Sequence, residues 1–181
     1  FMEAKQTNPL LQYGALAAVV GLVAYIGLYL GGVKVMTSPL AFIMNLLPIL
    51  FAVLACIAVK KQKGGYLEFG EALKISFGIF VISGLVVSIF SFILFNYIDL
   101  EFKQAMQQAS LELSEKMMKN FGASQDQIDK AMEQASKKDN FSFANVMLGF
   151  AISCFIYFLL SLIIALIVRK KNPENQMPQT L

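Results

Sequence analysis

Four long runs of apolar residues, none with a charged side chain in its interior, dominate the pattern of the chain. They cover residues 10–30, 40–59, 75–98 and 146–168. A hydrocarbon layer about 30 Å thick needs roughly 20 helical residues to cross it, so each run is long enough to span a bilayer. The strict alternation of a membrane β-barrel is missing, and lipid cannot satisfy an open backbone. The sequence therefore predicts an all-α fold, an integral membrane four-helix bundle that forms a single membrane domain.

Turn-forming residues punctuate the first two runs. Asn8–Pro9 is a start signal for the first helix, and Gly31–Gly32 is a stop signal. Ser38–Pro39 starts the second helix in the same way. Pro48 lies inside that helix and removes a backbone donor, so we expect a kink there.

The segment 99–143 between the third and fourth runs is polar and lacks proline. Its first part carries one apolar stripe at intervals of three or four residues, which predicts a helix. Gly122 ends that pattern, and Ser124 with Gln127 forms a capping box for a second helix. We expect an extramembrane helical hairpin whose stripe packs within the hairpin, lies on the membrane surface, or binds a partner. The stripe consists of Phe102, Met106, Ala109, Leu113 and Met117; Phe102, Met106, Leu113 and Met117 are the candidate partner surface.

The distribution of lysine and arginine predicts the topology. One basic cluster (Lys60, Lys61 and Lys63) follows the second run, and another (Arg169, Lys170 and Lys171) follows the fourth. Because basic flanks stay in the cytoplasm, we expect both termini to be cytoplasmic and residues 99–143 periplasmic. The six lysines within 99–143 oppose this topology, but eight acidic residues accompany them. The polar tail 172–181 is expected to be disordered.

Composition argues against most catalytic and binding chemistries. The 181-residue chain is 57% hydrophobic and 15% charged, against about 25% charged in soluble domains. Histidine is absent, and the two cysteines lie within apolar runs. No nucleotide, hydrolase or metal motif occurs, and no basic patch is interleaved with aromatic residues. We therefore expect no enzyme activity, no cofactor, no metal and no nucleic-acid partner.

Small residues mark candidate faces for helix packing, because small side chains let helices approach closely in lipid. The first run carries them at intervals of three or four, and the fourth run carries two more. The face could pack within the chain, or it could hold a second copy or an unidentified membrane protein. The residues are Gly14, Ala17, Gly21, Ala24, Gly27 and Gly31, with Gly149 and Ser153 in the fourth run.

A second candidate feature is a polar path through the bundle, built by hydroxyl and amide side chains inside the runs. Its residues are Asn45, Ser83, Ser88 and Ser91, with Ser153. Serine hydroxyls also bond to their own helix, so a water-filled path is not required. Asn45 either bridges helices or satisfies the carbonyl that Pro48 leaves free.

Several segments in order resemble a known family. Asn8–Pro9 precedes a first run with Tyr13–Gly14, and GGYLEFGEALK at 64–74 enters the third run. NYID at 96–99 leaves that run, GAS at 122–124 opens the next helix, and a basic stop follows the fourth run. Together they resemble, over nearly the whole chain, the bacterial membrane family catalogued as domain of unknown function 4199, common in the Bacteroidota. The resemblance implies a bacterial inner-membrane protein and supplies no catalytic residue.

Three functions stay open at this point. The first is a non-enzymatic subunit or scaffold of an envelope assembly that uses the small-residue face and the hairpin. The second is a small channel or carrier that uses the polar path. The third is an accessory subunit of a membrane glycosyltransferase or lipid-modifying enzyme, since the chain also resembles families whose genes lie near such enzymes.

Overall fold

The computed structural model describes residues 8–170, and over them the chain is helical apart from turns and one isolated β-bridge. Four helical segments are long and apolar enough to cross a membrane: Pro9–Leu30, Pro39–Gln62, Phe69–Ile98 and Phe143–Val168. The expected tail 172–181 lies outside the described residues. The helices are α1 Pro9–Leu30, α2 Val33–Met36, α3 Pro39–Met44, α4 Leu47–Gln62, α5 Phe69–Ile93, η1 Leu94–Ile98, α6 Leu100–Asn120, α7 Gln125–Ser136 and α8 Phe143–Val168.

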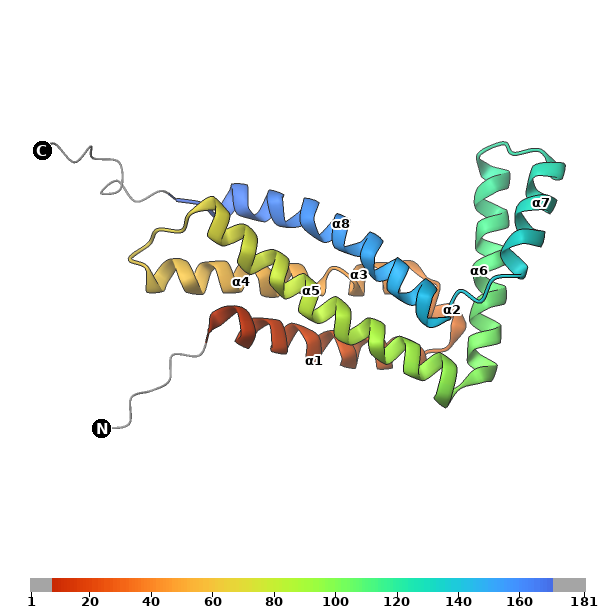
Figure 1. Ribbon diagram of the computed structural model, residues 1–181, viewed down its shortest axis with the longest axis horizontal. Coiled ribbons are helices and arrows are strands. Elements are labelled where there is room, and N and C mark those ends of the chain that lie inside the picture. The colour runs from red at the N-terminus through yellow and green to blue at the C-terminus, as the bar shows by residue number, and fades with distance from the viewer. Residues whose placement is uncertain (1–7, 171–181) are drawn as a thin grey trace, which may run out of the picture.

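The four spans run alongside one another around α5, which contacts α1, α4 and α8 (Figure 1). The start of α1, the connection from α4 to α5 and the end of α8 lie together at one end of the bundle, here called the lysine end. The short α2 and the pair α6–α7 lie at the opposite end, here called the arm end. We call α6–α7 the arm; it runs across the end of the bundle rather than along it (Figure 1).

The predicted start and stop signals of the first span are confirmed. The Asn8 side chain accepts a hydrogen bond of 3.1 Å from the Leu10 amide, and Pro9 is the first helical residue. Gly31 caps the helix, and Gly32 has a φ of 82°, a conformation that glycine adopts without steric cost. The chain can therefore turn directly into α2.

The second span is two helices rather than the one kinked helix expected over 40–59. α3 ends at Met44, and α4 begins at Leu47 with Pro48 in its first turn. Proline has no N–H to donate and fits the first turn of a helix, so a new helix begins there. The Asn45 side chain donates to the Ala41 carbonyl at 2.8 Å, and so bonds within its own turn.

The third and fourth spans extend beyond the apolar runs. α5 begins at Phe69 rather than at 75, with Glu68 as the capping residue and Glu71 in the first turn. An acidic side chain there is stabilised by the helix dipole. The span ends in the π-helical turn η1, which is closed by a 2.8 Å bond from the Asp99 amide to the Leu94 carbonyl. α8 begins at Phe143, earlier than the expected 146.

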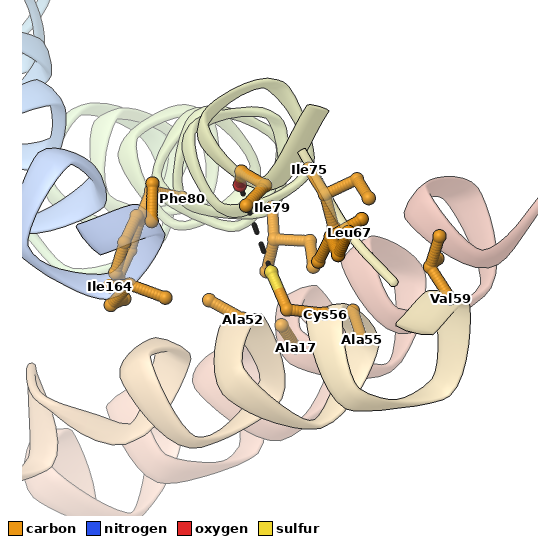
Figure 2. Packing of buried hydrophobic residues seen from close by; sticks show 12 residues of the cluster. Ala17, Ala52, Ala55, Cys56, Val59, Leu67, Ile75, Ile79, Phe80 and Ile164 are labelled. Atoms are coloured by element: carbon orange, nitrogen blue, oxygen red, sulfur yellow. Dashed lines mark hydrogen bonds between the residues drawn. The ribbon is translucent and has the colours of Figure 1, made fainter. Parts of the chain in front are cut away.

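The main core fills the lysine-end half of the bundle. Small side chains of α4, including Ala52, Ala55 and Cys56, are fully buried against α5, where Ile79 is equally buried (Figure 2). The Cys56 Sγ atom lies 3.7 Å from the Ala72 carbonyl oxygen. Small residues allow the close helix approach on which packing in lipid depends.

Two contacts close the lysine end. Leu67, just before α5, and Lys170, just after α8, form a β-bridge through amide–carbonyl bonds of 2.9 and 2.8 Å. The Lys60 ammonium also donates to the Val168 carbonyl at 2.7 Å. That carbonyl is one of the last in α8, where a cation both satisfies the free acceptor and interacts favourably with the helix dipole. The ends of α4, α5 and α8 are thereby joined.

α5 and α8 approach each other closely at Gly84. A Cβ atom built there would lie 2.9 Å from the Tyr157 ring, which itself stacks on Phe80 with centroids 5.3 Å apart. Gly149, by contrast, has nothing within 4 Å of the equivalent position. Packing between α5 and α8 therefore requires glycine at position 84 but not at position 149.

We predict that Gly84→Ala destabilises the protein by about 1–3 kcal/mol, because the added methyl group must displace a ring held between two helices. Gly149→Ala is the matched control. It meets open space and gains up to about 1 kcal/mol of helix propensity. Thermal unfolding of both variants in one detergent measures the difference. Equal stability of the two variants would contradict this packing of α5 against α8.

Candidate functional site

The predicted small-residue face of α1 divides along its length. Gly14 and Ala17 are buried, and a Cβ atom at Gly14 would lie 3.0 Å from the Ile82 Cδ1 atom of α5. Gly21 and Ala24 are half-buried and line a cavity. Gly27 and Gly31 are exposed. A Cβ atom at Gly27 would meet nothing within 4 Å, whereas one at Gly31 would lie 2.9 Å from Val35 of α2. The residues nearer the lysine end therefore pack within the chain, and of the last two only Gly27 is open to another molecule.

The cavity occupies the arm-end half of the bundle and has a volume of about 350 Å³. Its walls come from α1, α3, α4, α5 and α8, and Met106 of α6 also lines it. It begins where the second span is interrupted, next to Asn45 and Pro48. The break between α3 and α4 thus coincides with a hollow in the bundle.

The cavity brings together most of the predicted polar path. Asn45, Ser83, Ser88 and Ser153 all line it. Ser91 does not line it, but its hydroxyl accepts a 2.8 Å bond from Tyr25, which does. Residues from four segments far apart in the sequence therefore meet in one place.

Three polar side chains of the cavity, including Asn45, bond within their own helical segments. Ser83 donates to the Ile79 carbonyl at 2.9 Å, and Ser153 donates to the Gly149 carbonyl at 2.9 Å. The lining includes no carboxylate, ammonium or guanidinium group. A site of this kind suits an uncharged ligand, because an unpaired ion at membrane depth is costly.

The cavity is closed toward the lysine end by the main core. Phe80 and Ile79 of α5 are at most 1% exposed, and they pack with Ile164 and Ala165 of α8 (Figure 2). The interior of proteins packs as densely as organic crystals, which excludes a continuous path through such a cluster. The hollow is therefore confined to one half of the bundle.

The arm is attached to the bundle by a first polar joint at Asp99. The Asp99 carboxylate caps α6 by accepting a 2.8 Å bond from the Phe102 amide, and it accepts a 2.7 Å bond from the Tyr29 hydroxyl of α1. Both bonds lower the pKa of Asp99 from its ordinary value, and the bond from the Phe102 amide has the larger effect. Asp99 thus fixes the start of α6 to the end of α1.

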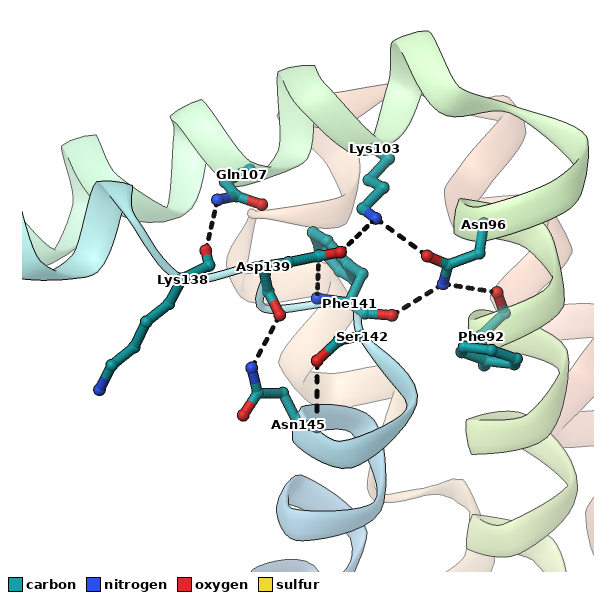
Figure 3. A network of polar contacts seen from close by, with 9 residues as sticks. All are labelled: Phe92, Asn96, Lys103, Gln107, Lys138, Asp139, Phe141, Ser142 and Asn145. Carbon is teal, nitrogen blue, oxygen red and sulfur yellow. Dashed lines mark hydrogen bonds and ion pairs between the residues drawn. The ribbon is translucent and has the colours of Figure 1, made fainter.

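A second joint centres on Lys103 (Figure 3). Its ammonium group donates to the side-chain amide oxygen of Asn96 at 2.9 Å and pairs with the Asp139 carboxylate at 2.6 Å. Asn96 in turn donates to the Phe92 and Phe141 carbonyls at 2.9 and 2.7 Å. The Lys103 side chain is only 16% exposed. The joint therefore links η1, α6 and the chain leading into α8.

Asp139 is the acidic partner in this joint. Burial raises the pKa of Asp139, but its hydrogen bond to Lys103, the backbone bonds from Phe141 and Ser142, and the Lys103 charge outweigh burial. Its pKa is therefore below the ordinary value, and folding favours the ionised form. Two neighbouring bonds hold the segment in place: Gln107 donates to the Lys138 carbonyl at 2.6 Å, and Asn145 donates to the Asp139 carbonyl at 2.7 Å.

Apolar contacts complete the attachment. Leu94, Phe95 and Met106 form a second buried cluster, with Phe102 and Phe141 packed against it. The Phe95 ring lies 4.4 Å from that of Phe141 and 6.0 Å from that of Phe102, measured between centroids. Aromatic pairs at these distances add to the effect of burial alone. The first turns of α6 are thereby held by both polar and apolar contacts.

The predicted stripe of α6 is accordingly divided. Phe102 and Met106 belong to the attachment, whereas Leu113 and Met117 are 48% and 51% exposed beyond it. The capping box of α7 is confirmed, with the Ser124 amide donating to the Gln127 side chain at 3.1 Å. α6 and α7 contact each other, and Ile128 is buried.

Sequence reasoning did not find the residues of the two joints. Tyr29, Asp99, Lys103 and Asp139 are separated by up to 110 positions and share no motif. The one local signal was Asp99, an aspartate directly before an apolar-periodic segment, which is a typical helix cap. Across residues 8–170, no group of three or more His, Cys, Asp or Glu side chains is placed to hold a metal ion.

Comparison with known proteins gives one match. A family model described as "Protein of unknown function (DUF4199)" matches residues 12–170, which include the arm and the four spans except the first three residues of α1. The chain belongs to the DUF4199 family. No curated protein and no solved structure matches it. DUF4199 is thus represented here by a helical protein with four helices long and apolar enough to cross a membrane, and its family description assigns no activity.

We predict that Asp139→Asn weakens the second joint by about 1–2 kcal/mol at neutral pH, because Lys103 loses its charged acceptor. The pKa of Asp139 is lowered in the fold, so its contribution is complete above the ordinary value of 3.8 and is lost as pH falls through the folded pKa. The difference between wild type and variant should therefore shrink as pH falls below about 4.

Hydrogen exchange of the α6 amides, corrected for the intrinsic effect of pH, gives the opening free energy. Glu133→Gln removes an ion pair of the same composition whose two side chains are 70% and 69% exposed, and it should change little. An unchanged opening free energy in Asp139→Asn at neutral pH would show that the joint does not hold the arm.

Proposed function

We propose that this chain is a non-enzymatic subunit or scaffold of an envelope assembly in a bacterial inner membrane. The observation that carries this proposal is the arm: a pair of helices held across the end of the bundle by two polar joints and an apolar cluster. Holding a surface in one orientation lowers the entropy cost of binding a partner.

We also propose that the arm is an extramembrane hairpin on the periplasmic side, with both termini in the cytoplasm. Lys60, Lys61 and Lys63 lie at the lysine end, as do Arg169 and Lys170. Basic residues directly beside spans favour the cytoplasmic face. The arm carries lysines of its own, but several pair with acidic neighbours, as Lys119 does with Glu115 at 2.5 Å and Lys137 with Glu133 at 2.7 Å.

This topology predicts opposite labelling of two single cysteines. In a background with Cys56→Ala and Cys154→Ser, Glu133→Cys in α7 should react with an impermeant maleimide added to spheroplasts. Gln62→Cys at the end of α4 should react only after the inner membrane is broken. Both positions are exposed, so accessibility alone does not separate them. The reverse pattern would invert the topology, and labelling of both in intact spheroplasts would contradict a single orientation.

The scaffold proposal predicts a partner whose binding depends on the position of the arm. A stoichiometric membrane partner, or a defined oligomer, should copurify with the tagged protein in mild detergent. Lys103→Met should reduce copurification, because it removes the cation that joins Asn96 to Asp139. Lys137→Met, which removes an exposed pair on α7, should retain it. Native mass spectrometry of the three preparations measures the stoichiometry.

A monomer without a partner in all three preparations would contradict the scaffold proposal. The second candidate function, a small carrier or channel, would then be favoured. The cavity supports that candidate, since Asn45, Ser83, Ser88 and Ser153 converge on it. The closed core at the lysine end means that a carrier would have to rearrange α4, α5 and α8 to pass a solute. Solute flux into liposomes that contain only this protein would decide between the two.

A further inference from the structure

The second half of α6 presents an apolar surface that no described residue covers. Leu113, Met117 and Phe121 are 48%, 51% and 83% exposed. On the other side of α6, Leu111 and Met132 line the hollow between α6 and α7. The exposed surface is therefore separate from the contact between α6 and α7.

The direction of this surface follows from the geometry of α6. Leu113 and Met117 follow Met106 by seven and eleven residues, and at 3.6 residues per turn both point within about 20° of Met106. Met106 is 9% exposed and packs with Leu94 and Phe95 at the end of the third span. α6 continues across the end of the bundle (Figure 1). Leu113 and Met117 thus face back along the spans, beside the bundle, where the bilayer lies.

The level of α6 also matches the membrane surface. The third span ends with Tyr97 and Ile98, which are 74% and 63% exposed, and Asp99 then starts α6. Phe143, 60% exposed, begins the fourth span at the same end. Tyrosine is enriched where hydrocarbon meets the headgroups, so Tyr97 places the start of α6 at the boundary of the membrane.

The surroundings of the stripe suit lipid headgroups. A groove of about 910 Å³ lies between α2 and α6, and Leu113 contributes to it. Lys34 and Lys116 line this groove, as do Glu101 and Glu112. Phosphate and ammonium groups of a zwitterionic headgroup would find charges of the opposite sign there.

We propose that the second half of α6 lies in the boundary between headgroups and hydrocarbon of the bilayer, with Leu113 and Met117 inserted among the lipid chains. Amphipathic helices that lie in this plane bury their apolar face by about 5–10 Å. The first half of α6 is held by protein and the second half by lipid. This inference does not depend on which side of the membrane holds the arm, nor on a partner.

The absence of tryptophan from the chain allows a direct test. Leu113→Trp and Met117→Trp, each a single fluorophore, are placed in nanodiscs with one copy of the protein per disc. We expect blue-shifted emission, and loss of its intensity when the disc lipid is replaced by dibrominated phosphatidylcholine. Phe155→Trp, at a position 67% exposed in the fourth span, is the quenched reference. Glu133→Trp on α7 is the unquenched reference.

Each outcome decides the proposal. Quenching at both 113 and 117 comparable with that at 155 supports insertion into lipid. Emission at long wavelength without quenching, as at 133, would overturn it, because the stripe would then face water. Blue-shifted emission without bromine quenching would overturn it as well, because protein rather than lipid would cover the stripe. A failed partner search leaves all these results unaffected, so the two proposals fail independently.

Discussion

Every other span packs against α5, and the rest of the structure depends on that contact. α5 contacts α1, α4 and α8, and α1 also contacts α4. α4 and α8 both contribute residues to the main core. In lipid, packing rather than the hydrophobic effect draws helices together, so close approach is needed. Glycine and alanine supply it: Gly84 admits the ring of Tyr157, and Ala52 and Ala55 admit α5 itself.

The two halves of the bundle manage polar groups differently. Inside the spans, serine hydroxyls such as Ser76 and Ser83 bond to carbonyls of their own helix, and these bonds hold no second element. At the arm end, Tyr29, Asn96 and Lys103 bond between elements instead. Charged groups are affordable there because headgroups and water are near. One hydrogen bond inside the spans does join two helices, from the Tyr25 hydroxyl of α1 to that of Ser91 in α5. The polar contacts that attach the arm all lie at the arm end of the bundle.

The sequence was sufficient for features that depend on local chemistry. Four apolar runs predicted four spans, and Asn8–Pro9, Gly31–Gly32 and the capping box at Ser124 located helix ends to within a few residues. Features that depend on packing were not predictable. In the sequence, Pro48 is compatible with a kinked helix or with the start of a new one. The cavity beside it could not be predicted either, because its walls come from other spans whose positions the sequence does not give.

The same limit applies to the candidate sites. The polar-path residues were found because hydroxyl and amide groups are conspicuous in apolar runs, yet their convergence on one cavity, and its closure at one end, came only from the fold. The stripe of α6 was found by periodicity. Its division between an attached half and an exposed half was not, because Phe102 and Leu113 look alike in sequence and differ only in what lies beneath them. The functional role of each set stays a prediction.

The β-bridge between Leu67 and Lys170 has a consequence for biosynthesis. Leu67 is synthesised directly before the third span, but its bonding partner Lys170 leaves the ribosome more than 100 residues later. Until the fourth span is inserted, the lysine end of α4 and α5 lacks both this bridge and the cap that Lys60 gives to Val168. While the arm is still being translated, the first three spans therefore lack these two contacts at the lysine end. In the partly synthesised chain, this end of α4 and α5 therefore lacks every contact that α8 later provides.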